Sequence, residues 1–353
     1  MNAPVRAGHQ VRSLDWRDAG ELHRIESFVS EQRASLFHSP AWLCAVEAGT
    51  GQRGAGLVAE RLGVVTGWLP LTEVRSALFG KALVSSGFGV GGGICAETPE
   101  AARALASTAE ALAARGGFGG IELRGGPIPE GWDCWDDKHC GFERPLADSD
   151  EAELLAIPRK ARAEVRKGLA LGHRVTIGRG VDDLAAHYAC YSESVRNLGT
   201  PVFPKRLFRA MLEAFANTSD ILTVWDGRTP LASVLSFYHN GAVMPFWGGG
   251  VLAARATRAN ERMYYELMLH ARRQGMTRFD FGRSKTGSGP FAFKKNWGFA
   301  PAPLTYGAWT APGAPPRNID PTDVSYSRKI ALWKKLPLPV ANLLGPRIAR
   351  GLA

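Results

Sequence analysis

The alternation of apolar and polar positions is clearest in the second half of the chain, where it predicts three consecutive strands. Residues 221–225, 231–239 and 242–247 are rich in β-branched and aromatic side chains. Asp-Gly at 226–227 and Asn-Gly at 240–241 separate these segments, and both pairs favour the short turns of antiparallel hairpins. The stretch therefore predicts an antiparallel meander.

Helical periodicity flanks this meander. The pattern predicts helices over 158–171, 182–198 and 204–215 before the meander and over 260–274 after it. A strand over 278–281 follows, and a Gly-rich loop then leads to a final strand.

The N-terminal part of the chain repeats part of this order. Two strands are predicted over 57–61 and 63–71, a helix over 99–115 and a further strand over 121–124. Residues 131–141 are polar and irregular, so they are expected to form a surface loop.

This order of elements indicates two similar α+β halves. A length of 353 residues also exceeds what a single core normally supports. We therefore predict an N-terminal domain over 1–148, a second domain over 149–309, and a linker with a basic amphipathic tail over 310–353.

The charge balance adds a preference for anionic partners. The chain carries 43 Lys and Arg against 33 Asp and Glu, which gives a net charge of +10. Such an excess suits nucleic acid, phosphorylated small molecules or a membrane surface and does not choose among them. Five irregularly spaced cysteines predict no disulfide framework. With no signal peptide and no apolar run of about 20 residues, the expected location is the cytoplasm.

The stretch from Phe279 to Phe299 is the strongest candidate for chemistry. An aromatic-rich strand ends at Asp280, a Gly-rich loop follows, and Lys294 and Lys295 then lie between aromatic residues. Lysine is a flexible point charge that reaches phosphate. The alternative is a strand–loop–strand with solvated lysines.

Three parts of the chain resemble the FemAB group of acyltransferases, which attach amino acids from aminoacyl-tRNA to peptidoglycan precursors. The resemblance is strongest to FemAB-related proteins of exopolysaccharide loci associated with the PEP-CTERM sorting system. The parts are 69–93 with 121–124, then 159–167 with Tyr191, Arg196 and Gly199, and lastly 280–282 with Phe293 and Lys294.

The resemblance implies a fold and a reaction. The fold is two tandem GNAT-like domains with a cleft between them. The reaction is amide formation, in which an aminoacyl group passes from aminoacyl-tRNA to a nucleotide- or lipid-linked cell-envelope or exopolysaccharide precursor. No cofactor is expected.

The identity of the acyl donor depends on the segment before the long helix. GNAT enzymes that use acyl-CoA place a Gly-rich turn there, which binds the pyrophosphate. Residues 255–261 contain no glycine, which favours aminoacyl-tRNA, although their arginines would still suit phosphate. Two alternatives stay open. One is an N-acyltransferase of an amino sugar or amino acid that uses acyl-CoA or an acyl carrier protein, and the other is a non-catalytic binding module.

The resemblance also directs the choice of site residues. Lys294 would offset oxyanion or phosphate charge, and Asp280 would accept a proton from the attacking amine or hold a strand-end turn through backbone N–H groups. Substrate binding is expected at Arg283, Lys295, Arg196, Tyr191, Lys81 and Ser85. The basic run is a candidate tRNA track, or otherwise a solvated helix face, through Arg159, Lys160, Arg162, Arg166 and Lys167.

Two other stretches carry residues of functional types. The cluster from Asp133 to Cys140 offers metal-ligand types but lacks a paired Cys-x-x-Cys, so no metal site is expected. The tail over 324–353 has basic but no acidic residues between its apolar positions. It would contact an anionic inner membrane peripherally, or would pack on the protein's own surface.

Overall fold

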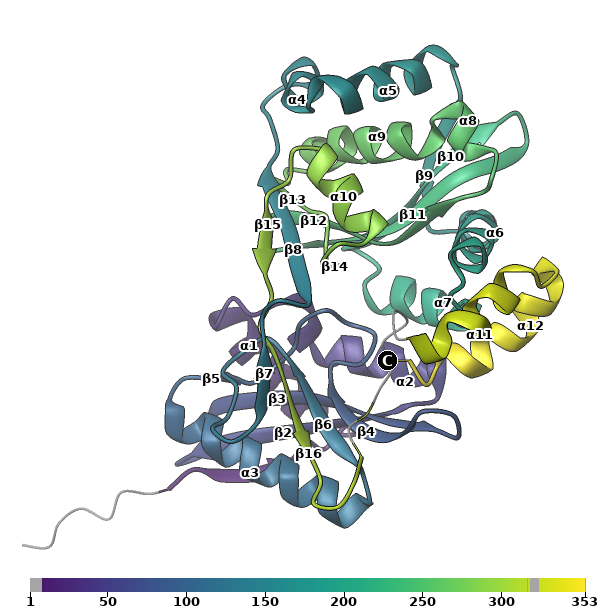
Figure 1. Ribbon diagram of the computed structural model, residues 1–353. Coiled ribbons are helices and arrows are strands. Elements are labelled where there is room, and N and C mark those ends of the chain that lie inside the picture. The colour runs from purple at the N-terminus through teal and green to yellow at the C-terminus, as the bar shows by residue number, and fades with distance from the viewer. Residues whose placement is uncertain (1–7, 316, 318–323, 353) are drawn as a thin grey trace, which may run out of the picture. The chain divides into compact units, whose positions relative to one another are not determined.

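The computed structural model describes residues 8–315, 317 and 324–352, and these form two compact units (Figure 1). The described part of one unit is 8–136, 304–315, 317 and 350–352, and that of the other is 137–303 and 324–349. Each unit contains its own eight-stranded sheet. The prediction of two α+β units is therefore confirmed.

The first unit places helices α1 to α3 around its sheet. The strand order is β1-β2-β3-β4-β6-β16-β7, with β5 paired to β3. Strands β4 and β6 run parallel, and α3 connects them. The elements are β1 (Gln10–Ser13), α1 (Ala19–Glu31), the 3-10 helix η1 (Leu36–His38), α2 (Pro40–Thr50), β2 (Arg53–Arg61), β3 (Val64–Ser76), β4 (Gly80–Ser85), β5 (Cys95–Ala96), α3 (Pro99–Gly116), β6 (Gly120–Arg124), β7 (Asp133–Trp135) and β16 (Tyr306–Thr310).

Local sequence accounts for the bounds of α3. The Thr98 side chain accepts a hydrogen bond from the backbone N–H of Ala101, and a proline follows Thr98 at the first helical position. Gly117 ends the helix at φ +63°, a left-handed conformation that glycine adopts without strain. The buried face, which includes Leu105, packs with Leu69 in the core of the unit.

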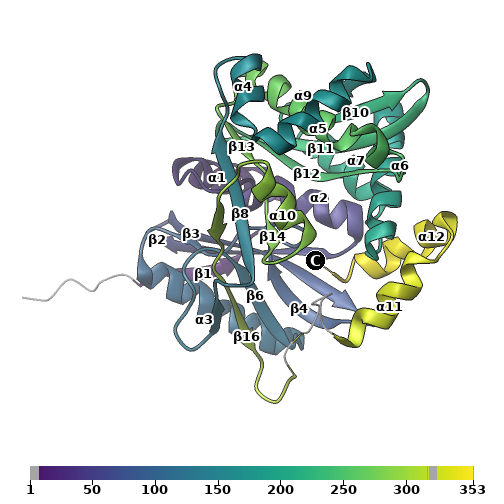
Figure 2. The same ribbon diagram turned by 45° about the horizontal axis from the view of Figure 1, so that its top comes forward.

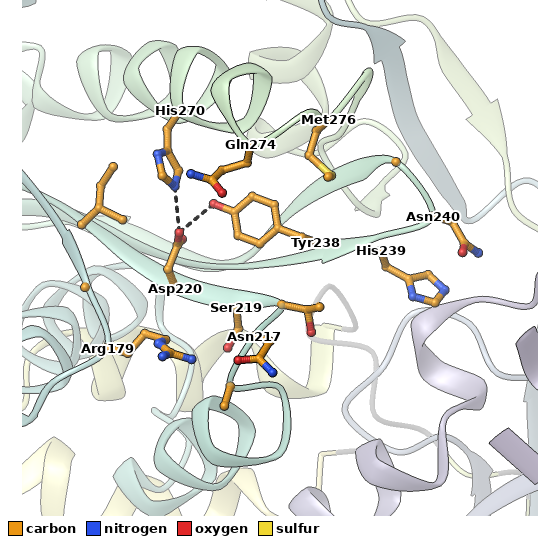
Figure 3. Close-up of a pocket in the computed structure, with 15 residues that line it drawn as sticks. Arg179, Asn217, Ser219, Asp220, Tyr238, His239, Asn240, His270, Gln274 and Met276 are labelled. Carbon is orange, nitrogen blue, oxygen red and sulfur yellow. Dashed lines mark hydrogen bonds and ion pairs between the residues drawn. The ribbon is translucent and has the colours of Figure 1, made fainter. Parts of the chain in front are cut away.

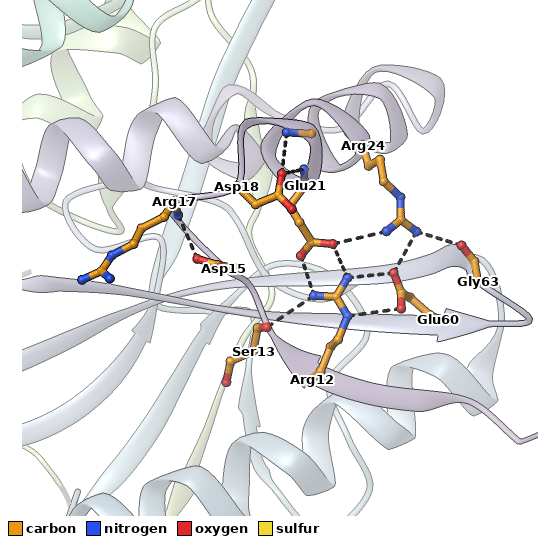
Figure 4. A network of polar contacts seen from close by, with 10 residues as sticks. Arg12, Ser13, Asp15, Arg17, Asp18, Glu21, Arg24, Glu60 and Gly63 are labelled. Carbon is orange, nitrogen blue, oxygen red and sulfur yellow. Dashed lines mark hydrogen bonds and ion pairs between the residues drawn. The ribbon is translucent and has the colours of Figure 1, made fainter.

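Charged residues hold the first strand and helix together (Figure 4). Arg12 of β1 donates hydrogen bonds to Glu21 of α1 and Glu60 of β2, and Arg24 of α1 also reaches both carboxylates. The hydrogen bonds from Arg12 are the main cause that keeps the pKa of Glu60 below its ordinary value. The charge of Arg12 and the hydrogen bond and charge of Arg24 act in the same direction. This network fixes α1 against the edge of the sheet.

The second unit has the same core order as the first. Its strands run β14-β8-β13-β12-β11-β10-β9, with β15 paired to β8. The elements are β8 (His139–Pro145), α4 (Asp150–Ala156), α5 (Arg159–Ala170), β9 (Arg174–Gly178), α6 (Val181–Leu198), α7 (Lys205–Ala214), β10 (Ser219–Asp226), β11 (Thr229–His239), β12 (Ala242–Gly250), α8 (Ala254–Thr257), α9 (Ala259–Arg273), β13 (Arg278–Asp280), β14 (Ser284–Lys285), α10 (Gly289–Asn296), β15 (Pro301–Pro303), α11 (Val324–Lys334) and α12 (Leu338–Ala349).

The meander predicted from the sequence forms the centre of this second sheet. Strand β10 pairs antiparallel with β11, and β11 pairs antiparallel with β12. After the long helix α9 the chain returns as β13, which pairs parallel with β12. Helix α9 lies on one face of the sheet and α6 on the other (Figures 1 and 2). Met263, Leu267 and Ala271 of α9 are fully buried in the core of this unit. In each unit, therefore, a helix connects two parallel strands.

The units divide at different residues from those predicted. The residues of strand β8 were expected to belong to the first domain, but this strand pairs with β13, β14 and β15 of the second unit. Most residues of strand β16 were expected to lie at the end of the second domain, but this strand pairs with β6 and β7 of the first unit. The changes of unit therefore fall at 136/137 and 303/304 instead of 148/149 and 309/310. Hydrogen-bonding partners, which lie far away in sequence, decide to which sheet a strand belongs.

Two local predictions are wrong. The segment 131–141 was expected to be a loop, but it contains β7 and the start of β8. The final strand expected after the Gly-rich loop is the helix α10. Ser288 caps this helix by accepting a hydrogen bond from the N–H of Phe291, and Pro290 occupies its first turn.

The tail forms two helices, α11 and α12, that pack on α6. Arg196 of α6 donates to the carbonyl of Lys334, and the Asn342 amide lies 3.4 Å from the Ser192 hydroxyl. One side of the tail therefore packs on the protein's own surface, as one of the two alternatives expected, and these contacts do not test the membrane alternative. None of the helices in the described residues has both the length and the apolar character to cross a membrane.

Candidate active site

The end of β13 starts the candidate site. Phe279 is fully buried between neighbouring strands, and Phe281, which follows the strand, is 4 % exposed. Gly282 then adopts φ +71°, so the chain turns sharply after Asp280. The turn presents two successive backbone carbonyls, those of Gly282 and Arg283, to α10.

Lys294 of α10 binds these two carbonyls. Its Nζ donates to the oxygens of Gly282 and Arg283, each at 3.0 Å. The ring centroids of Phe142 and Phe281 lie 5.4 and 5.5 Å from the same atom. A protonated lysine has three N–H donors. Two of these N–H groups are used by the carbonyls of Gly282 and Arg283, and those bonds leave the third N–H unused.

Burial changes the acidity of this lysine. Lys294 is only 8 % exposed. Loss of water around the ammonium lowers the pKa of Lys294 from its ordinary 10.5 to about 8; the charge of Asp280 opposes this effect and that of Arg283 adds to it. Tyr264, which lies 4.7 Å from Phe281, belongs to the aromatic cluster that keeps this region apolar. At neutral pH the lysine stays mostly protonated but releases its proton more readily than an exposed lysine.

The lowered pKa predicts how stability changes with pH. Between pH 8 and 10.5 the unfolded chain holds a proton on Lys294 that the folded protein has released. The free-energy cost of burying the charged ammonium of Lys294 is therefore present in full below pH 8 and is relieved above pH 10.5. Relative to Lys294→Met, we expect the free energy of unfolding of the unmodified protein to rise by about 3 kcal/mol across that window. Urea denaturation of both proteins at several pH values measures it, and a pH-independent difference would contradict the lowered pKa.

Asp280 lies beside this lysine and holds the turn. Its carboxylate accepts a hydrogen bond of 2.8 Å from the backbone N–H of Gly282. Burial raises the pKa of Asp280 above its ordinary value; the Gly282 hydrogen bond opposes this effect and Glu143 adds to it. The carboxylate therefore makes the strand-end contact that was weighed as the alternative, while its raised pKa also makes it a better proton acceptor.

The other expected substrate-binding residues fall into two groups. Arg283 is partly buried next to Lys294, and Lys295 is exposed with its Nζ 5.7 Å from the Phe291 ring centroid. In the first unit, Lys81 is exposed on β4, but Ser85 is fully buried and accepts a hydrogen bond from the backbone N–H of Arg124.

The two expected residues on α6 have structural contacts. Tyr191 stacks on His187 and packs edge-on against Phe208, and burial raises its pKa. This position favours a packing role for Tyr191. Arg196 is partly buried and contacts α11 through the carbonyl of Lys334.

The expected tRNA track is a helix with one basic face. Helix α5 buries Val165 and Gly168. Arg162 is partly buried and donates to the carbonyl of Leu155, so it lies off the outer face. The exposed cations of the helix are Arg159, Lys160, Arg166 and Lys167.

Carboxylates lie at the start of α9, where an acyl-CoA enzyme binds pyrophosphate. Glu164 of α5 pairs with Arg258, the residue before α9, and Glu261 lies in the first turn of the helix. Burial raises the pKa of Glu261, and the charge of Glu164 contributes to the increase. Gly168 of α5 also packs tightly here, because a Cβ on it would lie 2.8 Å from the Arg258 carbonyl oxygen. The sequence signal was a lack of glycine, but the ion pair between Glu164 and Arg258 at this helix start was missed.

A separate pocket of about 570 Å³ lies on the second unit (Figure 3). The Asp220 carboxylate accepts a hydrogen bond from Tyr238 and pairs with the ring of His270, at 2.8 and 2.9 Å. The residues that line this pocket include neither Lys294 nor Asp280. Sequence analysis named none of these residues, since β10, β11 and α9 supply one each from distant positions.

Side chains of metal-ligand types do not gather into a cluster in the part of the chain that the structure describes. The described residues contain no group of three or more His, Cys, Asp or Glu side chains arranged to hold an ion. Cys134 and Cys140 lie on different strands, β7 and β8.

A family comparison matches most of the second unit. Residues 158–295 match the model described as the GNAT acetyltransferase domain, a span that includes both Asp280 and Lys294. The chain is an acyltransferase with two GNAT-like domains. No curated protein matches the sequence of this acyltransferase.

Solved structures share the tandem fold of the acyltransferase. FemX is 15% identical with a TM-score of 0.60, covering 82% of this chain and 96% of its own. L-PGS from Bacillus licheniformis is 12% identical with a TM-score of 0.54, over 95% and 97%. A tandem GNAT protein from the clavulanic acid biosynthesis pathway is 13% identical with a TM-score of 0.55, over 88% and 100%. The expected resemblance to FemAB-type proteins is thus confirmed for the fold.

Proposed function

We propose that the protein transfers an aminoacyl group from aminoacyl-tRNA to an amine of a nucleotide- or lipid-linked cell-envelope precursor. The choice of aminoacyl-tRNA over CoA as the donor rests on the carboxylates at the start of α9. Glu164 and Glu261 place carboxylates where a GNAT enzyme would bind the pyrophosphate of CoA, and Glu164 engages Arg258 in an ion pair. The Arg258 guanidinium is thus paired with a carboxylate of the protein itself, which disfavours CoA there. The fold shared with FemX and L-PGS and the exposed cations of α5 support an aminoacyl-tRNA donor.

In this reaction Asp280 would accept one proton and Lys294 would supply one. A neutral acceptor amine attacks the ester carbonyl of the aminoacyl group, and the carbonyl oxygen becomes an oxyanion. The third N–H of Lys294 stabilises that oxyanion. The amine then loses a proton to Asp280, the ester C–O bond breaks, and the tRNA ribose oxygen leaves as a hydroxyl after taking a proton. With its pKa of about 8, Lys294 is acidic enough to supply that proton.

Filter binding at physiological salt tests the donor. We expect tighter binding of aminoacyl-tRNA than of uncharged tRNA, with the preference reduced in Lys294→Met. Micromolar binding of CoA with no preference for charged tRNA would support the acyl-CoA alternative, which the match to the GNAT acetyltransferase model favours. Equal and salt-sensitive binding of both tRNAs would count against aminoacyl transfer.

The outer face of α5 provides a second test. In the triple variant Arg159→Gln, Lys160→Gln and Arg166→Gln, we expect tRNA affinity to fall at least tenfold. The slope of log affinity against log salt should become shallower by about 2, because each lost phosphate contact removes roughly 0.7 to 0.9. Arg209→Gln, an exposed cation on α7 of the same unit, is the control and should leave the slope unchanged. An effect of Arg209→Gln about one third as large as that of the triple variant would mean that only total charge matters, because the control removes one charge and the triple variant removes three.

A further inference from the structure

Helix α12 packs with its small residues inward and its large apolar residues outward. Ala341, Gly345 and Ala349, spaced four apart, are its buried positions. A Cβ on Gly345 would lie 3.0 Å from Val202, so this face can approach its neighbour closely only because it lacks side-chain bulk. In a helix that only covers the surface, the large apolar residues would normally face inward.

The outward positions of the tail are instead apolar and basic. Leu343 is 65 % exposed and Leu344 and Val340 are each 40 % exposed, although α12 is well packed on its other side. On α11, Leu332 is 66 % exposed, and Ile330 faces Gly199 of the α6 end. The exposed cations that accompany these side chains are Arg328, Lys329, Lys334, Lys335 and Arg347. From 324 to 353 the sequence contains no acidic residue.

We propose that this outer face of α11 and α12 binds the surface of an anionic lipid bilayer. Exposed apolar side chains and exposed cations on the same two helices match the two parts of such a surface: the leucines enter the interface between headgroups and acyl chains, and the cations pair with anionic headgroups. Charge complementarity selects this occupant over a second copy of the protein, because two such faces, each basic and without acidic residues, would repel each other. The inference is independent of the acyl donor and would stand if the donor were acyl-CoA.

Vesicle flotation tests the proposal with full-length protein. Vesicles of equal parts phosphatidylglycerol and phosphatidylcholine should bind the protein at physiological salt, and pure phosphatidylcholine should bind it at least tenfold less. The variant Leu343→Glu with Leu344→Glu should reduce binding to the anionic vesicles at least tenfold. Leu252→Glu is the matched control, since Leu252 is also 65 % exposed on the same unit, and it should bind like the unmodified protein.

Three outcomes overturn the proposal. One is failure of the unmodified protein to float with anionic vesicles, and another is equal flotation of the double variant and the control. The third is a concentration-dependent dimer in sedimentation that the double variant abolishes, without vesicle binding, which would assign the face to a second copy. Circular dichroism of the variants confirms that the exposed substitutions leave the fold intact.

Discussion

Replacing Lys294 with methionine is expected to slow aminoacyl transfer by about 100- to 1,000-fold. That is the usual effect of removing one donor from an oxyanion site, on the order of 3–4 kcal/mol. Methionine fills the same apolar space beside Phe142 and Phe281 but has no N–H for the oxyanion. The measurement is the rate of transfer of labelled amino acids from a mixed pool of charged tRNA to nucleotide- and lipid-linked envelope precursors.

Lys295→Met is the matched control for this prediction. Lys295 is adjacent in α10 but exposed, so its loss should change the rate by only a few-fold. A Lys294→Met variant that keeps full activity would refute the assignment. In the unmodified protein, transfer that depends on protonated Lys294 should decline as pH rises through about 8.

Arg144→Met is expected to cost about 3–5 kcal/mol of folding free energy, the largest stability effect predicted here. Arg144 of β8 pairs with Glu153 of α4, whose side chain is 1 % exposed. Glu153 also accepts a hydrogen bond from the N–H of Ala147, which alone would not compensate a buried charge. Thermal or urea unfolding measures the loss.

Two further variants separate burial from simple loss of an ion pair. Arg278→Met removes an ion pair with Glu143 in which both side chains are over 40 % exposed, and it should cost less than about 1 kcal/mol. Arg144→Met combined with Glu153→Leu should recover most of the lost stability, because no buried charge then remains unpaired. If Arg144→Met and Arg278→Met cost the same, burial of Glu153 is not what makes the first pair important.

Several parts of the site could be read directly from the sequence. The strand before Asp280 and the position of Lys294 among aromatic residues were both expected, and the structure brings these two residues to one turn. The strand expected after the loop is α10 instead. Its aromatic residues favour strands, but Ser288 and Pro290 are helix-start signals that could have corrected the prediction.

The sequence alone determined the elements whose signals lie within a few residues of each other: the β10–β12 meander with its Gly turns, and α3 with its cap at Thr98. Only the tertiary structure decided which sheet receives β8 and β16. The same is true of the lowered pKa of Lys294, the pairing of Glu164 with Arg258 at the start of α9 and the outward leucines of α12. Turns and caps depend on neighbouring residues. Strand partners, burial and the field of nearby charges depend on segments far apart along the chain.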